Sequence, residues 1–345
     1  MTKNALLILS SLLITLALLE GVFRLGAIDL RFVRSALFYQ EADLDVHQCS
    51  SDPFLHYELK PGASMQGIRP GGVPTRITID ERGARYPSHA VRKEPGTFRI
   101  LCFGGSTMYG AGVNDDETIA AALEARLNRL SAEDHSAAPR RYEVWNFGTS
   151  AYTLGQAAYL ARHQLAVLNP DLIVVQLHNV GRRPFLPVRV CDDIDLAMQT
   201  DGVSDFFLEQ FPAPDFLSDD SHRALVVHSA LYRALVTLLV RSPDGAPCPY
   251  CDRLSDEQAR LLLRAAHDRA VPVLFVAVPN DGGAIPASAY PELPPSQFID
   301  LYRPNREPEF YEIHPPAATL DEYAALLIDS MRARGFLPLN DPLRR

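Results

Sequence analysis

Four residues of the chain have the types that acyl-transfer chemistry requires. A nucleophilic serine needs a base to take its proton and hydrogen-bond donors to stabilise the oxyanion. Ser106 follows two glycines at the end of an apolar run, and His314 is followed by proline. Gly148 and Asn179 each follow a further apolar run and can supply donors. Together these residues predict a serine-based catalytic site.

The elements that must position these residues begin at residue 97, where strands and helices start to alternate. Four apolar runs predict buried strands, at residues 98–103, 142–147, 172–177 and 271–278. Capping signals predict helices that start near residues 114, 153, 255 and 319, and a further helix is expected over 224–240. This alternation is typical of an α/β fold with a doubly wound parallel sheet flanked by helices. Ligands on such sheets bind beyond the carboxyl ends of the strands, where Ser106, Gly148 and Asn179 are expected.

The motifs resemble those of the SGNH (GDSL-like) hydrolases over residues 97–336. Residues 103–110, with sequence FGGSTMYG, resemble the family block that carries the nucleophile. Residues 146–148 (NFG) and 171–179 (DLIVVQLHN) resemble the blocks that supply the oxyanion donors, and His314-Pro315 resembles the last block. The resemblance implies a flavodoxin-like three-layer fold, with Ser106 as nucleophile, His314 as base, and Gly148, Asn179 and the Ser106 amide as oxyanion donors.

Two positions depart from the family pattern. The third block usually reads Gly-x-Asn-Asp, whereas residues 177–180 here are LHNV. The last block usually has Asp three residues before the histidine, and Tyr311 occupies that position. The histidine still needs a group that fixes its tautomer, and a backbone carbonyl, Glu309 or Glu312 could serve.

The N-terminus predicts a membrane anchor. An uncharged apolar run from Ala5 to Leu19 reaches spanning length if Glu20 and Arg24 lie at the far interface. Because no clear cleavage site follows, an uncleaved signal anchor over residues 1–28 is favoured over a cleaved signal peptide. Either reading places the main domain outside the cytoplasm, on the periplasmic side of a bacterial cytoplasmic membrane. The anchored members of the family also have a turn-rich lead-in, here residues 29–96, and residues 337–345 form a tail.

The five cysteines fit an oxidising compartment. Cys248 and Cys251 have the spacing of a redox dithiol, but a loop-like stretch precedes them, so a structural loop disulfide is favoured over redox catalysis. Cys49 and Cys191 could pair with each other. Cys102 lies within a predicted strand and is expected to be a buried thiol.

Several function classes are disfavoured by composition and motif. The net charge is −9 without a densely basic stretch, which argues against nucleic acid as a partner. The chain has no P-loop and no Gly-x-Ser-x-Gly motif of a conventional α/β-hydrolase. Neither a metal nor an organic cofactor is implied, and zinc is disfavoured because no second Cys or His pair has matching spacing. Arg182 and Arg183 could hold an anionic substrate group or simply be solvated.

The sequence thus predicts an anchored serine esterase or acyltransferase that forms an acyl-enzyme on Ser106. The expected substrate is an ester of an extracytoplasmic glycan or lipid. The alternative is a binding or assembly protein of the cell envelope that uses this fold without turnover, because Tyr311 replaces the usual carboxylate.

Overall fold

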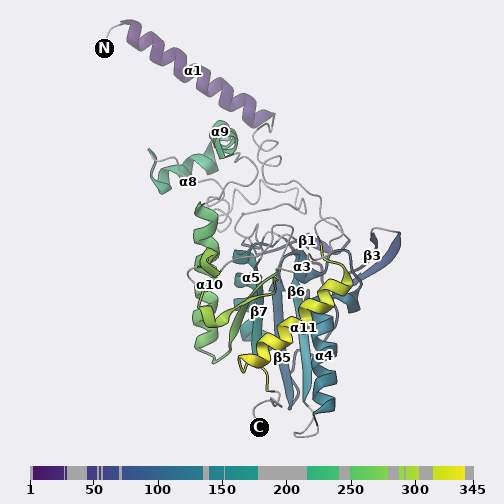
Figure 1. The fold of residues 1–345 in the computed structure, drawn as a ribbon. Helices are drawn as coiled ribbons and strands as arrows, with labels where there is room; N and C mark the ends of the chain where they lie inside the picture. Colours follow the sequence, from purple (N-terminus) through teal and green to yellow (C-terminus); the bar gives the residue numbers. More distant parts are fainter. Residues whose placement is uncertain are drawn as a thin grey trace.

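The computed structural model describes residues 3–26, 28, 45–52, 54–55, 57–69, 72–134, 140–150, 152–177, 216–240, 249–278, 287–290, 293–302 and 314–338. Its centre is a five-stranded parallel sheet, which confirms the predicted fold class (Figure 1). In spatial order the strands are β6 (Arg141–Gly148), β5 (Thr97–Gly104), β7 (Leu172–Leu177), β8 (Val273–Ala277) and β9 (Phe298–Asp300). The chain leaves β5 toward β6 on one side and returns to β7 on the other, so the strand order reverses between β5 and β7.

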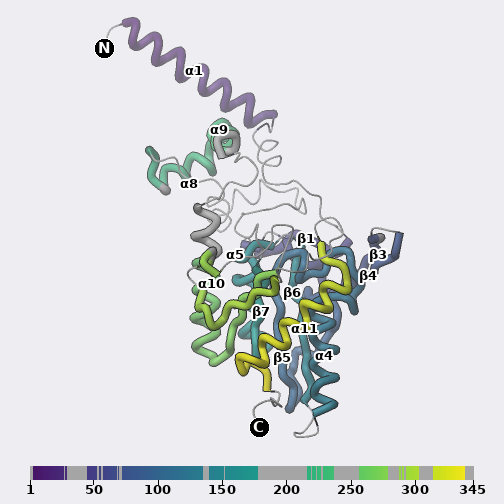
Figure 2. The backbone as a smooth tube through the Cα atoms, viewed as in Figure 1, coloured from purple at the N-terminus to yellow at the C-terminus, as the bar shows by residue number. Residues whose placement is uncertain are grey.

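Helices cover both faces of the sheet and give three layers (Figure 2). One face carries α4 (Ile119–Glu133) and α11 (Ala317–Ala333), and the other carries α5 (Leu154–Leu168) and α10 (Pro249–His267). Strand β5 is buried on both faces: Ile100 and Cys102 pack with the first helix pair, and Leu101 and Phe103 pack with the second. Cys102 is a free, buried thiol, as predicted.

Two of the four predicted capping signals, at residues 114 and 153, are present. Asn114 and Glu117 form a reciprocal capping box around the 3-10 helix η1 (Asp115–Glu117), and Thr118 then caps α4. A second box between Thr153 and Gln156 starts α5. These boxes satisfy backbone N–H groups that would otherwise lack partners at the helix starts.

Several predicted boundaries were wrong. The single helix expected over 224–240 is two helices, α8 (Asp219–His228) and α9 (Ala230–Val240), separated by Ser229 in an extended conformation. Helix α10 begins at Pro249, six residues before the predicted cap, so Cys251 lies in a helix rather than in a loop. Helix α11 begins at Ala317, two residues before the predicted start. Strand β9 was not predicted, because three residues carry too little periodicity.

The described part of the lead-in before the sheet contains two antiparallel hairpins. Strand β1 (His47–Cys49) pairs with β2 (Tyr57–Leu59), and β3 (Ser64–Arg69) pairs with β4 (Val73–Thr78). An antiparallel bridge from Arg85 to Asn146 then joins the lead-in to β6. Cys49 is disulfide-bonded, and Cys191, its suggested partner, lies outside the described residues.

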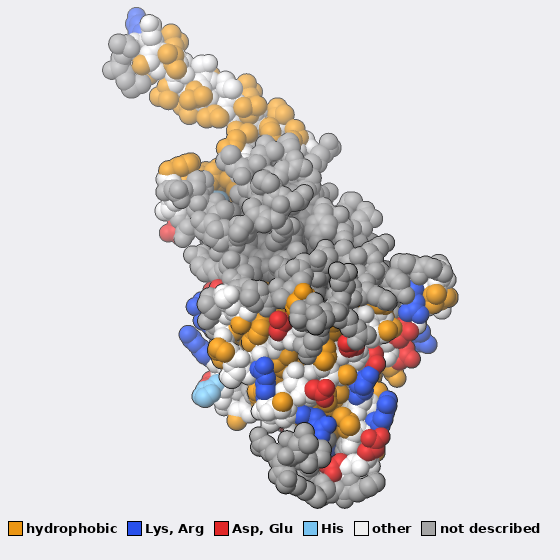
Figure 3. Space-filling view, in the orientation of Figure 1, with side chains coloured by type: hydrophobic (Ala, Val, Ile, Leu, Met, Phe, Trp, Pro, Cys, Tyr) orange, Lys and Arg blue, Asp and Glu red, His pale blue; other side chains and the backbone are white. Residues whose placement is uncertain are grey.

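The remaining elements are short, apart from the N-terminal helix α1 (Lys3–Leu25). By length and composition α1 could cross a membrane, a test that a signal sequence also passes. Its apolar side chains are exposed (Figure 3). The short elements are α3 (Ser106–Tyr109) and the 3-10 helices η2 (Ala287–Ala289) and η3 (Pro295–Gln297).

Candidate active site

Ser106 is the first residue of α3, directly after β5 and Gly105. It lies at the carboxyl end of β5, where the strand order reverses toward β7. Open parallel sheets bind ligands at such a position. The Ser106 side chain is partly exposed and makes no hydrogen bond to another described residue. The structure thus presents this hydroxyl where the sequence predicted a nucleophile.

Two buried amide side chains from the neighbouring strands hold the turn that carries Ser106. Gln176 on β7 accepts a hydrogen bond from the Met108 N–H through Oε1, at 2.9 Å. Asn146 on β6 donates through Nδ2 to the Met108 carbonyl, also at 2.9 Å. Both amides are almost fully buried, so the alternative to these bonds is an unsatisfied polar group. Helix α3 is therefore fixed to both flanking strands.

The close contact between α3 and the strands requires glycine at two positions. A Cβ atom on Gly104 would lie 2.5 Å from Cβ of Gln176, and one on Gly148 would lie 2.3 Å from the backbone nitrogen of Tyr109. Gly104 and Gly148 are register partners at the ends of β5 and β6. The two glycines let α3 rest directly on the edge of the sheet.

The N–H of Gly148, expected to be an oxyanion donor, is engaged in this structure. It donates to Oδ1 of Asn146 at 2.9 Å. An oxyanion would therefore have to replace the Asn146 oxygen before Gly148 could serve it. The structure brings Gly148 next to α3, and its observed role there is close packing.

Arg85 of the lead-in holds the loop that follows α3. Its guanidinium donates to the carbonyls of Tyr109, Gly110 and Val113, each at 2.6 Å, and forms an ion pair with Asp115 at 3.2 Å. Arg85 is fully buried. Burial lowers the pKa of Arg85, and Asp115 opposes that shift. The Arg85 guanidinium thus holds the backbone after α3 in place and does not bind a ligand.

The loop after β6 is held by a second part of the lead-in. The Tyr57 hydroxyl donates to the Ser150 carbonyl at 2.7 Å, and the Tyr152 hydroxyl donates to the Tyr57 carbonyl. Gln156 donates to the Leu55 carbonyl at 2.9 Å. Burial raises the pKa of Tyr152 well above its usual value, so this hydroxyl remains a donor. Both loops beside Ser106 are therefore braced by residues that precede the sheet.

The remaining predicted site residues are only partly covered. His314 lies three residues before α11, is partly buried, and has interaction partners within the protein. Its pairing with Ser106 stays a prediction. Seven residues considered for the site lie outside the described ranges: His178, Asn179, Arg182, Arg183, Glu309, Tyr311 and Glu312. Cys248, of the suggested loop disulfide, also lies outside them. Within the described ranges, no group of three or more His, Cys, Asp or Glu could hold a metal ion.

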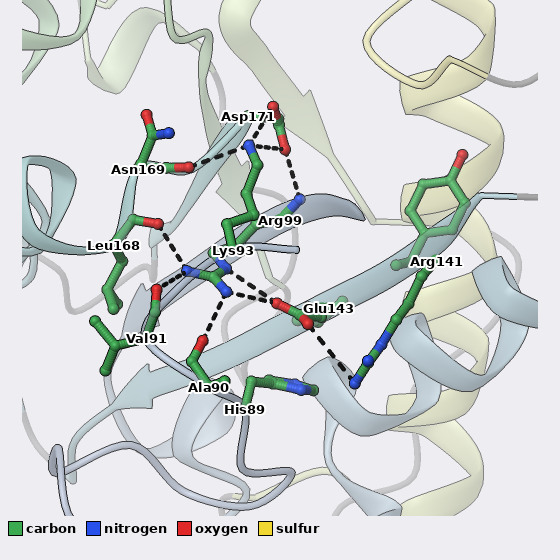
Figure 4. Close-up of polar contacts among 12 residues, drawn as sticks. His89, Ala90, Val91, Lys93, Arg99, Arg141, Glu143, Leu168, Asn169 and Asp171 are labelled. Carbon is green, nitrogen blue, oxygen red and sulfur yellow. Dashed lines mark hydrogen bonds and ion pairs between the residues drawn. The ribbon is translucent and has the colours of Figure 1, made fainter. Parts of the chain in front are cut away.

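A second polar cluster lies at the other end of the strands and is structural (Figure 4). Arg99, near the start of β5, is fully buried and pairs with Glu143 on β6 at 2.8 Å. Its remaining N–H groups donate to the carbonyls of Ala90, Val91 and Leu168. Because these partners lie in the lead-in, on β6 and at the end of α5, the cluster joins the lead-in to the sheet domain.

Sequence reasoning missed Gln176 and Arg85 as parts of the site. A polar residue within the otherwise apolar run 172–177 was the available signal for Gln176. Nothing in the lead-in distinguishes Arg85 from its neighbours Arg82 and Arg92, because only the fold shows which arginine is buried.

Comparison with known proteins gives similarity at the level of structure. No protein-family model matches the chain, and no curated protein matches it in sequence. Three of the similar solved structures are TesA, the psychrotrophic esterase EstA from Pseudoalteromonas sp., and a GDSL-like lipase from Bacteroides thetaiotaomicron.

These structures cover most of their own length but share little sequence with this chain. TesA and EstA are each 12% identical to it, with TM-scores of 0.36, and cover 68% of this chain and 99% and 97% of their own. The lipase is 13% identical, with a TM-score of 0.33, and covers 71% of this chain and 92% of its own. GDSL-like lipases and esterases are the proteins that the sequence motifs resemble. At such identities and TM-scores the similarity assigns no substrate and no catalytic residue to this chain.

Proposed function

We propose that this protein is a serine-dependent ester hydrolase or acyltransferase anchored by α1 in a bacterial cytoplasmic membrane. The main domain would face the periplasm, and the substrate would be an ester of an envelope glycan or lipid. The observation that supports the proposal best is the placement of Ser106. Its hydroxyl is partly exposed at the strand-order reversal, on a turn that Gln176 and Asn146 hold from both sides. A rigidly held nucleophile is what acyl transfer requires.

The proposed reaction forms an acyl-enzyme. Ser106 Oγ attacks the ester carbonyl while His314 takes the hydroxyl proton, and the oxyanion accepts hydrogen bonds from the Ser106 N–H and Asn179. Gly148 joins them only if its N–H leaves Asn146. The C–O bond then breaks, and the alcohol departs with the proton from His314. Water, or a second alcohol in a transferase, attacks the acyl group and restores Ser106.

A serine-directed fluorophosphonate tests the proposal on the full-length protein in membranes. We expect labelling of the wild type, loss of labelling in Ser106→Ala, and loss of ester turnover in both Ser106→Ala and His314→Ala. Ser150→Ala is the matched control, since Ser150 lies on the next loop, and it should still be labelled. Turnover that survives Ser106→Ala contradicts the mechanism.

The second candidate function is a binding or assembly protein with the same fold. The hydrogen bond from Gly148 to Asn146 favours it, because that bond occupies an N–H that a hydrolase of this kind is expected to keep for the oxyanion. A folded wild type that is neither labelled nor active on esters would support this candidate.

A further inference from the structure

The C-terminal end of α1 is attached to the corner between α8 and α9. Glu20 accepts hydrogen bonds from the Ser229 hydroxyl at 2.8 Å and from the N–H groups of Ala230 and Leu231 at 2.9 and 3.0 Å. Arg24 pairs with Glu20 at 2.7 Å and donates to the His228 carbonyl, at the end of α8. Two charged residues of the apolar helix are therefore matched to two helix ends about 200 residues further along the chain.

This contact solves a problem that Glu20 poses for a membrane helix. A carboxylate at the edge of the hydrocarbon region is costly unless donors surround it. Lipid chains supply none, whereas the corner supplies one hydroxyl and two backbone N–H groups beside Arg24. The hydrogen bonds between Glu20 and the corner are thus most stabilising at the edge of the hydrocarbon region, where no water competes for them.

The depth of the corner follows from the length of α1. Its 23 residues extend about 34 Å, close to the roughly 30 Å of a hydrocarbon core. Lys3 and Arg24 then lie near opposite headgroup regions, and Glu20 lies about 6 Å deeper than Arg24 along the axis. The first turn of α9, which contacts Glu20, is consequently placed at the boundary between headgroups and acyl chains.

The composition of α9 suits that boundary. Its sequence, ALYRALVTLLV, contains only Arg233 and Thr237 as clearly polar residues. A helix that is apolar on nearly all sides requires a core or a membrane around it. Yet Leu235 is 53% exposed, and Phe216, just before α8, is 84% exposed. Figure 3 shows apolar side chains on α1 and again on the α8–α9 pair.

We propose that α8 and α9 form a lipid-contacting element at the extracytoplasmic face of the bilayer, attached to α1 by Glu20 and Arg24. The occupant of the exposed apolar surface is the lipid bilayer, because the surface is continuous with α1, the one described helix that could span a membrane. A further consequence is that α1 is part of the folded protein and is retained. This inference rests on the proposed anchoring by α1 and is independent of any ester chemistry at Ser106.

Quenching by brominated lipid tests the lipid contact on the full-length protein in phosphatidylcholine vesicles. Trp145 is the sole tryptophan and is buried in the sheet, so the wild type provides the baseline. We expect the added fluorescence of Leu235→Trp to fall about twofold in brominated vesicles, as for Leu12→Trp within α1. Val167→Trp is the matched control, since Val167 is 48% exposed on α5, and it should be unaffected. Quenching of Leu235→Trp no greater than that of Val167→Trp, with Leu12→Trp quenched, would overturn the proposal.

Hydrogen exchange tests the attachment at Glu20 separately. In Glu20→Leu the amides of Ala230 and Leu231 lose their acceptor, and their exchange should accelerate roughly tenfold. Thr15→Leu, on the same helix but away from the corner, should leave both amides unchanged. Unchanged exchange in Glu20→Leu would show that the attachment does not exist in the membrane, and the proposal would fail.

Discussion

Gly148 offers a direct test of how the Ser106 turn is built. In Gly148→Ala the new Cβ would lie 2.3 Å from the Tyr109 nitrogen, so α3 must move away from β6. We expect destabilisation of about 1–3 kcal/mol and, if Ser106 is the nucleophile, a loss of ester turnover of roughly tenfold or more. Urea unfolding and turnover measure the two effects.

The matched control for this substitution is Gly21→Ala. Gly21 lies in α1, and nothing lies within 4 Å of the position its Cβ would take. This variant should keep both stability and turnover. A Gly148→Ala protein that behaves like the control would contradict the close packing of α3 on the sheet.

Cys102 is predicted to be chemically inert in the folded protein. Burial raises the pKa of its thiol to about 12, and the thiolate is the reactive form. At pH 8 the thiol is therefore almost entirely protonated, and the sheet also blocks access to it. Iodoacetamide should modify Cys102 only at urea concentrations that unfold the domain, as followed by peptide mass spectrometry. Stoichiometric modification under native conditions would contradict the burial of β5.

At the scale of elements, β7 is expected to act on the site through Gln176. Gln176→Met keeps a similar volume but leaves the buried Met108 N–H without its acceptor, which costs about 1–3 kcal/mol. We expect the ester kcat to fall with KM little changed and the Met108 amide to exchange faster. Gln176→Glu, which restores an acceptor oxygen, should recover part of both. An unchanged kcat in Gln176→Met would show that the hydrogen bond from the Met108 N–H to Gln176 does not position Ser106.

The Arg99–Glu143 pair, at the amino ends of β5 and β6, should contribute to the stability of the fold and not to the chemistry at Ser106. Glu143→Gln leaves Arg99 buried without a counter-charge, and urea unfolding should show a loss of about 3–5 kcal/mol. Asp321→Asn is the matched control. It breaks the Arg126–Asp321 pair, whose Asp321 side chain is 52% exposed, and should cost at most about 1 kcal/mol. Equal losses in the two variants would contradict the distinction between buried and exposed pairs.

The sequence predicted the elements whose signals are local and missed those fixed by distant contacts. The predicted ends of strand β5 and helix α5 are within a residue or two of the observed ones. An apolar run and a capping box are signals that consecutive or nearby residues carry. The break at Ser229 has neither Gly nor Pro to mark it. The Ser229 hydroxyl caps α9 locally by accepting from the Tyr232 N–H, but the N–H groups of Ala230 and Leu231 donate to the distant Glu20. For the same reason Ser106 could be placed from sequence, whereas the contacts of Gln176 and Arg85 with its loop could not.

At the scale of the whole molecule, we expect the lead-in and the sheet domain to unfold as one unit. Arg85 donates to the carbonyls of Tyr109, Gly110 and Val113, at the end of α3 and in the loop after it. Arg99 of β5 donates to the carbonyls of two lead-in residues, Ala90 and Val91. Tyr109 also packs in a cluster with Leu59 and Ile79. Buried hydrogen bonds and apolar contacts therefore cross residue 97, where the sequence predicts that the sheet domain begins.

A pair of truncations tests this unity. A chain that starts at Thr97 loses Arg85, the donor to three carbonyls near the carboxyl end of β5, and leaves N–H groups of the buried Arg99 without their acceptors at the amino end. It also exposes apolar surface that the hairpins cover, so each loss adds to the next. We expect it to lack a cooperative urea transition and near-ultraviolet circular dichroism. A chain that starts at Asp45 retains these contacts and also lacks α1, so it controls for the loss of the anchor and should unfold cooperatively. If the Thr97 chain unfolded at the same urea midpoint as the Asp45 chain, the lead-in would be an appendage, and Arg85 would have no part in holding the loop behind Ser106.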